Sequence, residues 1–208
     1  MFADLPVGDV GNFFFAHAQE RNSPALFSTV MHWFVSGACL VLFAVSANLD
    51  LLGSLLLRNA EYRAALEIVP YLMLGYLFLG VYYNISVWFK LTDRTYYGAW
   101  LTSIGALVTL VVNIVLIPIL GYWGSVWATV ASYATMCLVC YYWGQKYYPI
   151  PYQLGRNLAY VMGTMVCVFL VRQITYTNAA SAIASNLVFT LAFGALLYGL
   201  EGSRGTSR

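Results

Sequence analysis

The chain has 208 residues, of which 61% are hydrophobic and only 9% are charged. A soluble domain carries roughly a quarter charged residues, so this composition and the mean hydropathy of +0.73 exclude an ordinary soluble domain and indicate a membrane protein. The net charge of +2, with no basic run, argues against a nucleic acid partner. The 17 tyrosines and 6 tryptophans are typical of aromatic rings placed at the two membrane–water interfaces.

Residues 1–25 are predicted to be an N-terminal tail that carries the end of a preceding helix. The aromatic run F-F-F-A-H-A at 13–18 is too short to cross a membrane and ends in a polar turn. This tail contains acidic residues and lacks the basic start and apolar centre of a cleavable signal peptide. The first span is therefore expected to direct membrane insertion.

Six apolar segments follow, each a candidate transmembrane helix, because about 20 apolar residues cross roughly 30 Å of hydrocarbon. The predicted spans are 27–49, 64–89, 96–117, 122–145, 157–171 (short unless it extends to residue 176) and 180–200. We expect an all-α, polytopic integral membrane protein with a four-helix unit at 26–146, a loop at 147–156, two additional helices within 157–200 and a polar tail at 201–208.

The segment at 50–63 joins the first two spans and has two possible structures. Its leucine-rich start is followed by Arg58, Glu61 and Arg63, a pattern that fits a short amphipathic helix lying on the membrane interface. An ordinary loop, with the first span running on to Leu57, fits equally well.

The stretch at 113–132, N-I-V-L-I-P-I-L-G-Y-W-G-S-V-W-A-T-V-A-S, predicts two helices joined by a very short hairpin. Pro118 is expected to end the first helix, because an interior proline removes a backbone donor and clashes with the preceding turn. Gly121 and Gly124 would allow the chain to reverse and bring two backbones close together. We assign these three residues a structural role.

Membrane orientation follows from the distribution of Lys and Arg, which favour the cytoplasmic side. With six spans both termini lie on the same side, which then receives Arg21, Lys90, Arg94, Lys146, Arg156, Arg204 and Arg208, whereas the other side receives Arg58, Arg63 and Arg172. Both termini and the loop at 147–156 are therefore predicted to be cytoplasmic. Pro149 and Pro151 are expected to make that loop stiff.

The sequence contains no constellation that indicates catalysis, a metal site or a cofactor. No pair of carboxylates shares a helix face deep in a span, and no glycine-rich phosphate loop is present. Polar residues within spans usually face the bundle interior or a wet cavity. On that basis Asn84, Lys90 and Asn113 are candidates for lining a substrate path. Alternatively, Asn113 forms an interhelical hydrogen bond and Lys90 is a headgroup anchor.

Four motifs resemble one transporter family. V-P-Y-L-M-L-G-Y-L-F-L-G-V-Y-Y-N-I-S-V-W-F-K-L-T-D-R-T-Y-Y-G-A at 69–99 resembles the polysaccharide flippases of the multidrug/oligosaccharidyl-lipid/polysaccharide exporter superfamily. N-x-x-L-I-P-x-x-G-Y-x-G-x-x-W-A-T at 113–129 is similar to the eleventh and twelfth spans of that family, and G-Q-K-Y-Y-P-I-P-Y at 144–152 to the loop after them. The run at 13–18 resembles the end of the eighth span. The nearest branch is the bacterial O-antigen or lipopolysaccharide flippases.

The resemblance implies a fold and an activity. Such proteins move a lipid-linked oligosaccharide on an undecaprenyl-pyrophosphate carrier across the inner membrane, and two lobes rock around a polar cavity between inward-facing and outward-facing states. A full member has 12 to 14 spans, so these six would match the C-terminal lobe plus two terminal helices. A partial chain is therefore expected, either from a truncated or mis-started reading frame or as a fragment completed by an N-terminal lobe on another chain.

Two alternatives belong to other classes. The first is a non-transporting membrane anchor or inert remnant of such a transporter. A neighbouring reading frame that encodes about eight spans would favour the split transporter over this alternative. The second is an integral-membrane glycosyltransferase or acyltransferase, against which the lack of buried Asp, Glu and His argues.

Overall fold

In this computed structural model, residues 24–56, 66–173, 185–186 and 188–195 are described, and their secondary structure is helical without strands. The helices are α2 (Pro24–Ala47), α3 (Leu49–Leu56), α4 (Val69–Ile85), α5 (Val87–Leu91), α6 (Tyr96–Leu120), α7 (Tyr122–Tyr147) and α8 (Leu154–Arg172). Residues 185–186 and 188–195 are also helical. Of the predicted N-terminal tail at 1–25, only residues 24 and 25 are described. The predicted tail at 201–208 lies outside the described residues, and so do Arg58, Glu61 and Arg63.

Five segments of the described chain are long and apolar enough to cross a membrane: Pro24–Ala47, Leu66–Leu91, Tyr96–Leu120, Tyr122–Tyr147 and Leu154–Arg172. They correspond to the first five predicted spans, and they support the prediction of an all-α, multi-pass membrane protein. The sixth predicted span, 180–200, is described only at 185–186 and 188–195. The count of six spans therefore stays a prediction.

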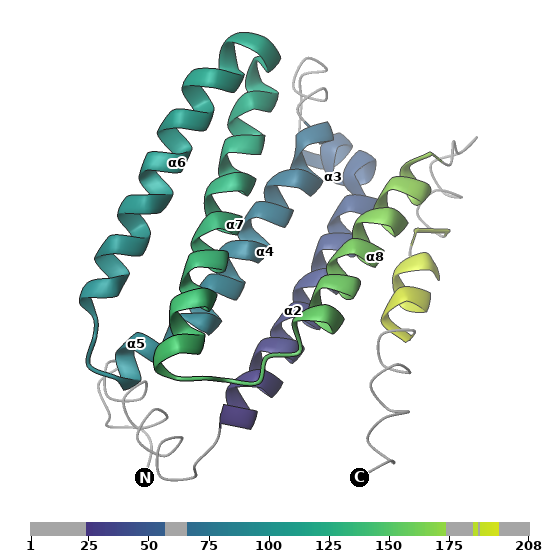
Figure 1. Cartoon of the computed structure of the whole chain (residues 1–208). Coiled ribbons are helices and arrows are strands. Elements are labelled where there is room, and N and C mark those ends of the chain that lie inside the picture. Colours follow the sequence, from purple (N-terminus) through teal and green to yellow (C-terminus); the bar gives the residue numbers. More distant parts are fainter. Residues whose placement is uncertain (1–23, 57–65, 174–184, 187, 196–208) are drawn as a thin grey trace, which may run out of the picture.

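The long helices lie side by side in the order α6, α7, α4, α2 and α8 (Figure 1). Long helices that follow one another in the sequence run in opposite directions, so two pairs that are neighbours in space, α4 with α7 and α2 with α8, are parallel (Figure 1). The helical residues at 185–195 pack against α2. There the rings of Phe43 and Phe193 stack with centroids 4.7 Å apart, and Asn186 Nδ2 donates to the Ala47 carbonyl at 2.6 Å.

The hairpin between α6 and α7 turns at a single residue, Gly121, which has φ 59° and ψ −134°. A residue with a Cβ rarely adopts this conformation. The prediction that Pro118 ends α6 is wrong, because the helix continues through Pro118 to Leu120. Proline there removes only one backbone donor of the last turn, and the Gly121 N–H still donates to the Ile117 carbonyl at 2.9 Å.

Small residues bring the helices of this region close together. A Cβ placed on Gly124 would lie 2.6 Å from the Leu116 carbonyl carbon, so α6 and α7 touch through their backbones. Further along the same pair, Ser132 Oγ donates to the Gly105 carbonyl at 2.8 Å. On the other side of α7, a Cβ on Gly75 of α4 would lie 3.3 Å from the Thr129 methyl. Close packing of this kind associates helices in lipid, where burial of apolar surface gives little.

α6 has the most apolar sequence of the five spans, yet it is the least buried. Its best 18-residue window has a mean hydropathy of 2.5 and is 6% buried, whereas that of α2 has a mean hydropathy of 1.9 and is 50% buried. Among its large exposed side chains are Leu107, Leu110, Val111, Ile114, Val115 and Ile119. A water-soluble monomer rarely exposes so large an apolar patch, which agrees with hydrocarbon as the surrounding solvent.

The first connection contains a separate helix. α2 ends at Ala47, and α3 begins at Leu49, with the Leu52 N–H donating to the Asn48 carbonyl at 2.9 Å. The first span therefore does not run on to Leu57 as one helix. α3 carries leucine side chains on its outer surface, among them Leu55, which is 78% exposed. This much fits the predicted amphipathic helix, and the rest of the segment, 57–65, lies outside the described residues.

Candidate functional site

The three residues predicted to line a substrate path lie apart. Asn84 is half-buried in the last turns of α4, where its Nδ2 donates to the Gly80 carbonyl of the same helix at 3.0 Å. Lys90 is exposed on α5, at the same end of the molecule. Asn113 lies about 25 Å along α6 from the start of that helix, at a rise of about 1.5 Å per residue. The structure therefore separates Asn113 from Asn84 and Lys90 along the helix axes.

The alternative for Asn113 is an interhelical hydrogen bond, and the structure describes one of its two polar side-chain atoms in this respect. Its Oδ1 is buried and has no hydrogen-bond partner. A buried amide oxygen without a partner costs about 1–3 kcal/mol. The side-chain oxygen therefore forms no interhelical hydrogen bond, and such a bond through the Asn113 amide nitrogen stays a prediction.

The structure gathers polar side chains elsewhere, between α2, α8 and the loop before α8. His32 Nδ1 and Asn157 Oδ1 are 2.7 Å apart, and each residue is 5% exposed. One turn before His32 on α2, Ser28 Oγ donates to the Pro151 carbonyl at 2.8 Å. The Tyr160 ring lies beside His32, with centroids 5.3 Å apart. These contacts fasten the start of α8 to α2.

The contact between His32 and Asn157 is a hydrogen bond between an imidazole and an amide. An amide oxygen only accepts hydrogen bonds, so Nδ1 of His32 carries the proton that it donates to Asn157. The described residues contain no group of three His, Cys, Asp or Glu side chains that could hold a metal ion. Nδ2 of Asn157 is buried and has no hydrogen-bond partner. The pair therefore acts as a hydrogen bond between two helices.

The loop at 148–153 is docked against the bundle. Gln145 Nε2 donates to the Ile150 carbonyl at 2.7 Å, and Ile150 is 1% exposed. The Tyr152 hydroxyl is buried without a hydrogen-bond partner, and burial raises the pKa of its phenol, so this side chain stays neutral at physiological pH. The predicted loop at 147–156 is thus shorter in the structure, since α7 ends at Tyr147 and α8 begins at Leu154, and the residues between them are held by buried contacts.

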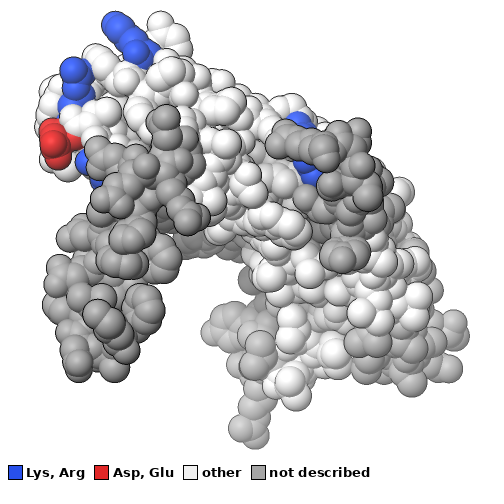
Figure 2. All heavy atoms as spheres, turned by 90° about the horizontal axis from the view of Figure 1, so that it is seen from below, with Lys and Arg blue, Asp and Glu red and all other residues white. Residues whose placement is uncertain are grey.

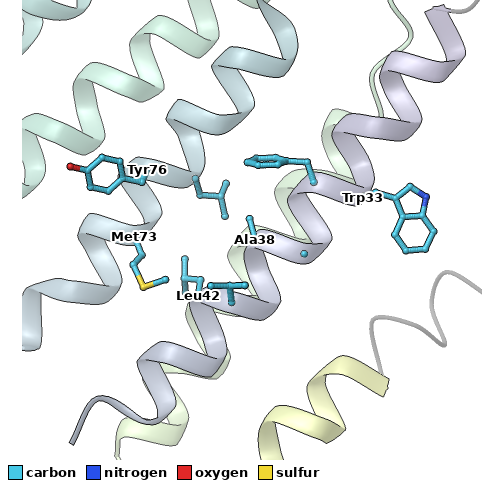
Figure 3. Close-up of a pocket in the computed structure, with 9 residues that line it drawn as sticks. Trp33, Ala38, Leu42, Met73 and Tyr76 are labelled. Carbon is cyan, nitrogen blue, oxygen red and sulfur yellow. The ribbon is translucent and has the colours of Figure 1, made fainter. Parts of the chain in front are cut away.

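Two apolar grooves flank the line along which α2 and α4 meet. The larger has a volume of about 500 Å³ and is lined by Trp33, Phe34, Gly37, Ala38, Val41, Leu42, Met73, Tyr76 and Leu77. In Figure 3, Met73 extends from α4 toward Leu42 of α2. The smaller has a volume of about 260 Å³, is bounded also by α7 and α8, and shares Leu77 with the first.

The grooves show what this contact can accommodate. Their linings are almost entirely apolar; the smaller one includes Asn157 as its one amide side chain. A dry apolar cavity of about 150 Å³ takes up benzene, so the smaller groove has room for about ten carbon atoms. The geometry fits hydrocarbon chains, and each groove has too few hydrogen-bonding side chains among its lining residues to bind a sugar.

Sequence reasoning missed the His32–Asn157 pair. The signal available was a polar residue near the same end of two apolar spans, but pairing them requires knowing that α2 and α8 are neighbours.

No protein-family model matches the sequence, and neither the curated proteins nor the solved structures give a match. The likeness of the motifs at 69–99 and 113–129 to the flippases therefore stays a prediction.

Proposed function

We propose that this protein is part of a flippase that moves a lipid-linked oligosaccharide across the bacterial inner membrane. The observation that carries the proposal is the order and spacing of the motifs at 69–99, 113–129 and 144–152, which resemble spans of that family and the loop that follows them. The substrate would be an oligosaccharide on an undecaprenyl-pyrophosphate carrier. The residues of this chain would form one part of the transporter.

The arrangement of the helices supports this proposal in two respects. The membrane-length helices lie side by side and leave α6 in contact mainly with α7, as a segment that completes a larger assembly would (Figure 1). The apolar grooves beside α2 and α4 fit hydrocarbon, which is the chemistry of a lipid carrier. The polar cavity for the sugar would form only against the other lobe.

The experiment is complementation of a flippase-null strain. The chain is expressed together with an N-terminal half that supplies the missing spans, and surface polysaccharide is measured. The N-terminal half alone is the negative control. Restored polysaccharide supports the proposal, whereas failure with confirmed expression and membrane insertion of both halves contradicts it.

A non-transporting anchor is the second candidate, and one observation favours it. Several intramembrane polar side chains are satisfied inside the protein: Asn84 by its own helix, Ser132 by α6, and His32 by Asn157. The bonds of Ser132 and His32 hold helices together, the bond of Asn84 stays within α4, and groups used in these ways need not line a path. An anchor would insert and fold normally and leave the null strain without surface polysaccharide.

The proposed orientation places both termini and the loop at 147–156 in the cytoplasm. Three basic residues support it: Lys90, Arg94 and Lys146. They lie at the end of the molecule where α5 ends, α6 begins and α7 ends. Cysteines introduced at exposed Lys146 and at exposed Gln173 test it with a membrane-impermeant thiol reagent. Labelling of position 146 in intact spheroplasts would contradict the orientation.

A further inference from the structure

A cluster of basic and aromatic side chains lies at the end of the molecule where α5, α6 and α7 meet, away from the grooves and the His32–Asn157 pair. We define the basic–aromatic cluster as Lys90, Arg94, Tyr97, Lys146 and Tyr147. Seen from below, Lys and Arg side chains gather over this end (Figure 2). We propose that this cluster binds the phosphate of an anionic phospholipid.

The sequence builds the cluster through a tight turn between α5 and α6. The Thr92 N–H donates to the Trp88 carbonyl at 3.0 Å, and the Arg94 N–H donates to the Phe89 carbonyl at 2.8 Å. Asp93, between them, has φ 55°, which asparagine and aspartate tolerate better than most residues. The turn fixes Arg94 beside the last turn of α7.

Packed rings form a rigid base for the cations. The buried Trp88 ring stacks on Tyr147 with centroids 5.6 Å apart. The Tyr97 hydroxyl donates to the Tyr147 hydroxyl at 2.8 Å. A Cβ on Gly144 would lie 2.9 Å from the Trp88 ring, so a glycine is needed for the indole to lie this close to α7. Tyr147 is therefore held in one position.

Two cations share the Tyr147 ring. The Arg94 guanidinium carbon is 4.2 Å from the ring centroid, and the Lys146 ammonium is 5.9 Å from it. Both are cation–π contacts, which orient the charges without neutralising them. Within the described chain, neither Arg94 nor Lys146 forms an ion pair with a carboxylate, although Asp93 is next to Arg94. Two oriented positive charges are thus left to bind an anion.

The depth of the cluster selects the anion. α6 has 25 residues and is about 37 Å long, which exceeds roughly 30 Å of hydrocarbon, and the polar and basic residues just before it favour its first turn as the end that reaches the headgroups. Phosphate oxygens lie at that level, and a guanidinium binds them with paired hydrogen bonds. Lys90 is exposed on the adjoining α5, at the same end of the molecule. Charge complementarity therefore favours an anionic over a zwitterionic phospholipid.

The test uses the full chain, purified in a neutral detergent, and native mass spectrometry with dioleoyl-phosphatidylglycerol and dioleoyl-phosphatidylcholine as probes. We expect preferential retention of phosphatidylglycerol by the unmodified protein. Each of Arg94→Gln and Lys146→Gln should weaken that retention about fivefold, since a basic residue near a membrane surface contributes about that much to binding an anionic lipid. The double variant should lose the preference, and Arg94→Lys should weaken it less than Arg94→Gln, because lysine keeps the charge but not the paired hydrogen bonds.

Arg172→Gln is the matched control, because it removes one positive charge at the end of α8, on the side of the molecule opposite the basic–aromatic cluster. It should leave the preference for phosphatidylglycerol unchanged. An equal loss with Arg172→Gln, or full retention by the double variant, would overturn the proposal. Lys146 is exposed, so Lys146→Gln keeps the fold and its result stands even where Arg94→Gln disturbs the turn. Addition of inorganic phosphate should displace the lipid weakly, and displacement at stoichiometric phosphate would overturn the assignment to a lipid.

Discussion

Gly124 holds the α6–α7 hairpin closed, and Gly124→Ala tests this directly. The added Cβ would lie 2.6 Å from the Leu116 carbonyl carbon and 2.7 Å from the Ile117 nitrogen. Carbon atoms in contact are normally about 3.5–4.0 Å apart. Both neighbours are backbone atoms, which cannot rotate away, so α7 must move about 1 Å from α6. Overpacking of this size costs about 1–3 kcal/mol.

Gly163→Ala is the control, because a Cβ at that exposed position of α8 meets nothing within 4 Å. Alanine favours a helix over glycine by about 1 kcal/mol, a gain common to both variants, so their difference isolates the steric cost. We expect Gly124→Ala to have a free energy of unfolding about 1–3 kcal/mol lower than Gly163→Ala. The measurement is reversible unfolding in SDS–detergent mixtures, followed by tryptophan fluorescence.

Equal free energies of unfolding for the two variants would show that backbone contact does not hold the hairpin. A larger loss in Gly163→Ala would show in addition that α8 has a partner at that face. Either result would refute the argument that α6 is fastened by close approach to α7.

Three further predictions concern the hairpin and the polar pair. Gly121→Ala should destabilise the protein by about 1–3 kcal/mol through its positive φ alone, since nothing lies within 4 Å of its Cβ position; the same SDS titration measures it. Pro118→Ala should leave the hairpin intact and should not lower stability, because Gly121 ends α6; a large loss would restore Pro118 as the terminator. For His32→Leu and Asn157→Leu, a double-mutant cycle should give a coupling of about 0.6–1.7 kcal/mol, the range for hydrogen bonds between membrane helices; additive losses would exclude the buried hydrogen bond.

The spans could be predicted from the sequence because membrane crossing requires a length and an apolarity that are local properties. The predicted starts at Tyr96 and Tyr122 are those of α6 and α7. Helix ends were harder to predict. α8 begins at Leu154, three residues before the predicted start, because the Asn157 N–H already donates to the Gln153 carbonyl at 3.0 Å.

The contacts between helices could not be predicted in the same way. His32 and Asn157 are 125 residues apart in sequence, and no periodicity pairs α2 with α8. The separation of Asn84 from Asn113 follows from the antiparallel directions of α4 and α6, which place a residue late in one helix opposite the start of the other. A list of polar residues within spans therefore identifies candidates and does not show which of them meet.

The inverse relation between apolarity and burial in the hairpin follows from the bilayer as solvent. α6 has a mean hydropathy of 2.5 and is 6% buried over its best window, whereas the values for α7 are 1.2 and 39%. In water the more apolar helix would be the one buried. In lipid, burial of Leu or Ile gains little, and close packing and hydrogen bonds associate helices instead. Leu101 and Gly105 are the buried residues of α6, and the Gly105 carbonyl accepts the Ser132 hydroxyl. The apolar remainder of α6 is thus suited to hydrocarbon, and its attachment depends on a few small residues.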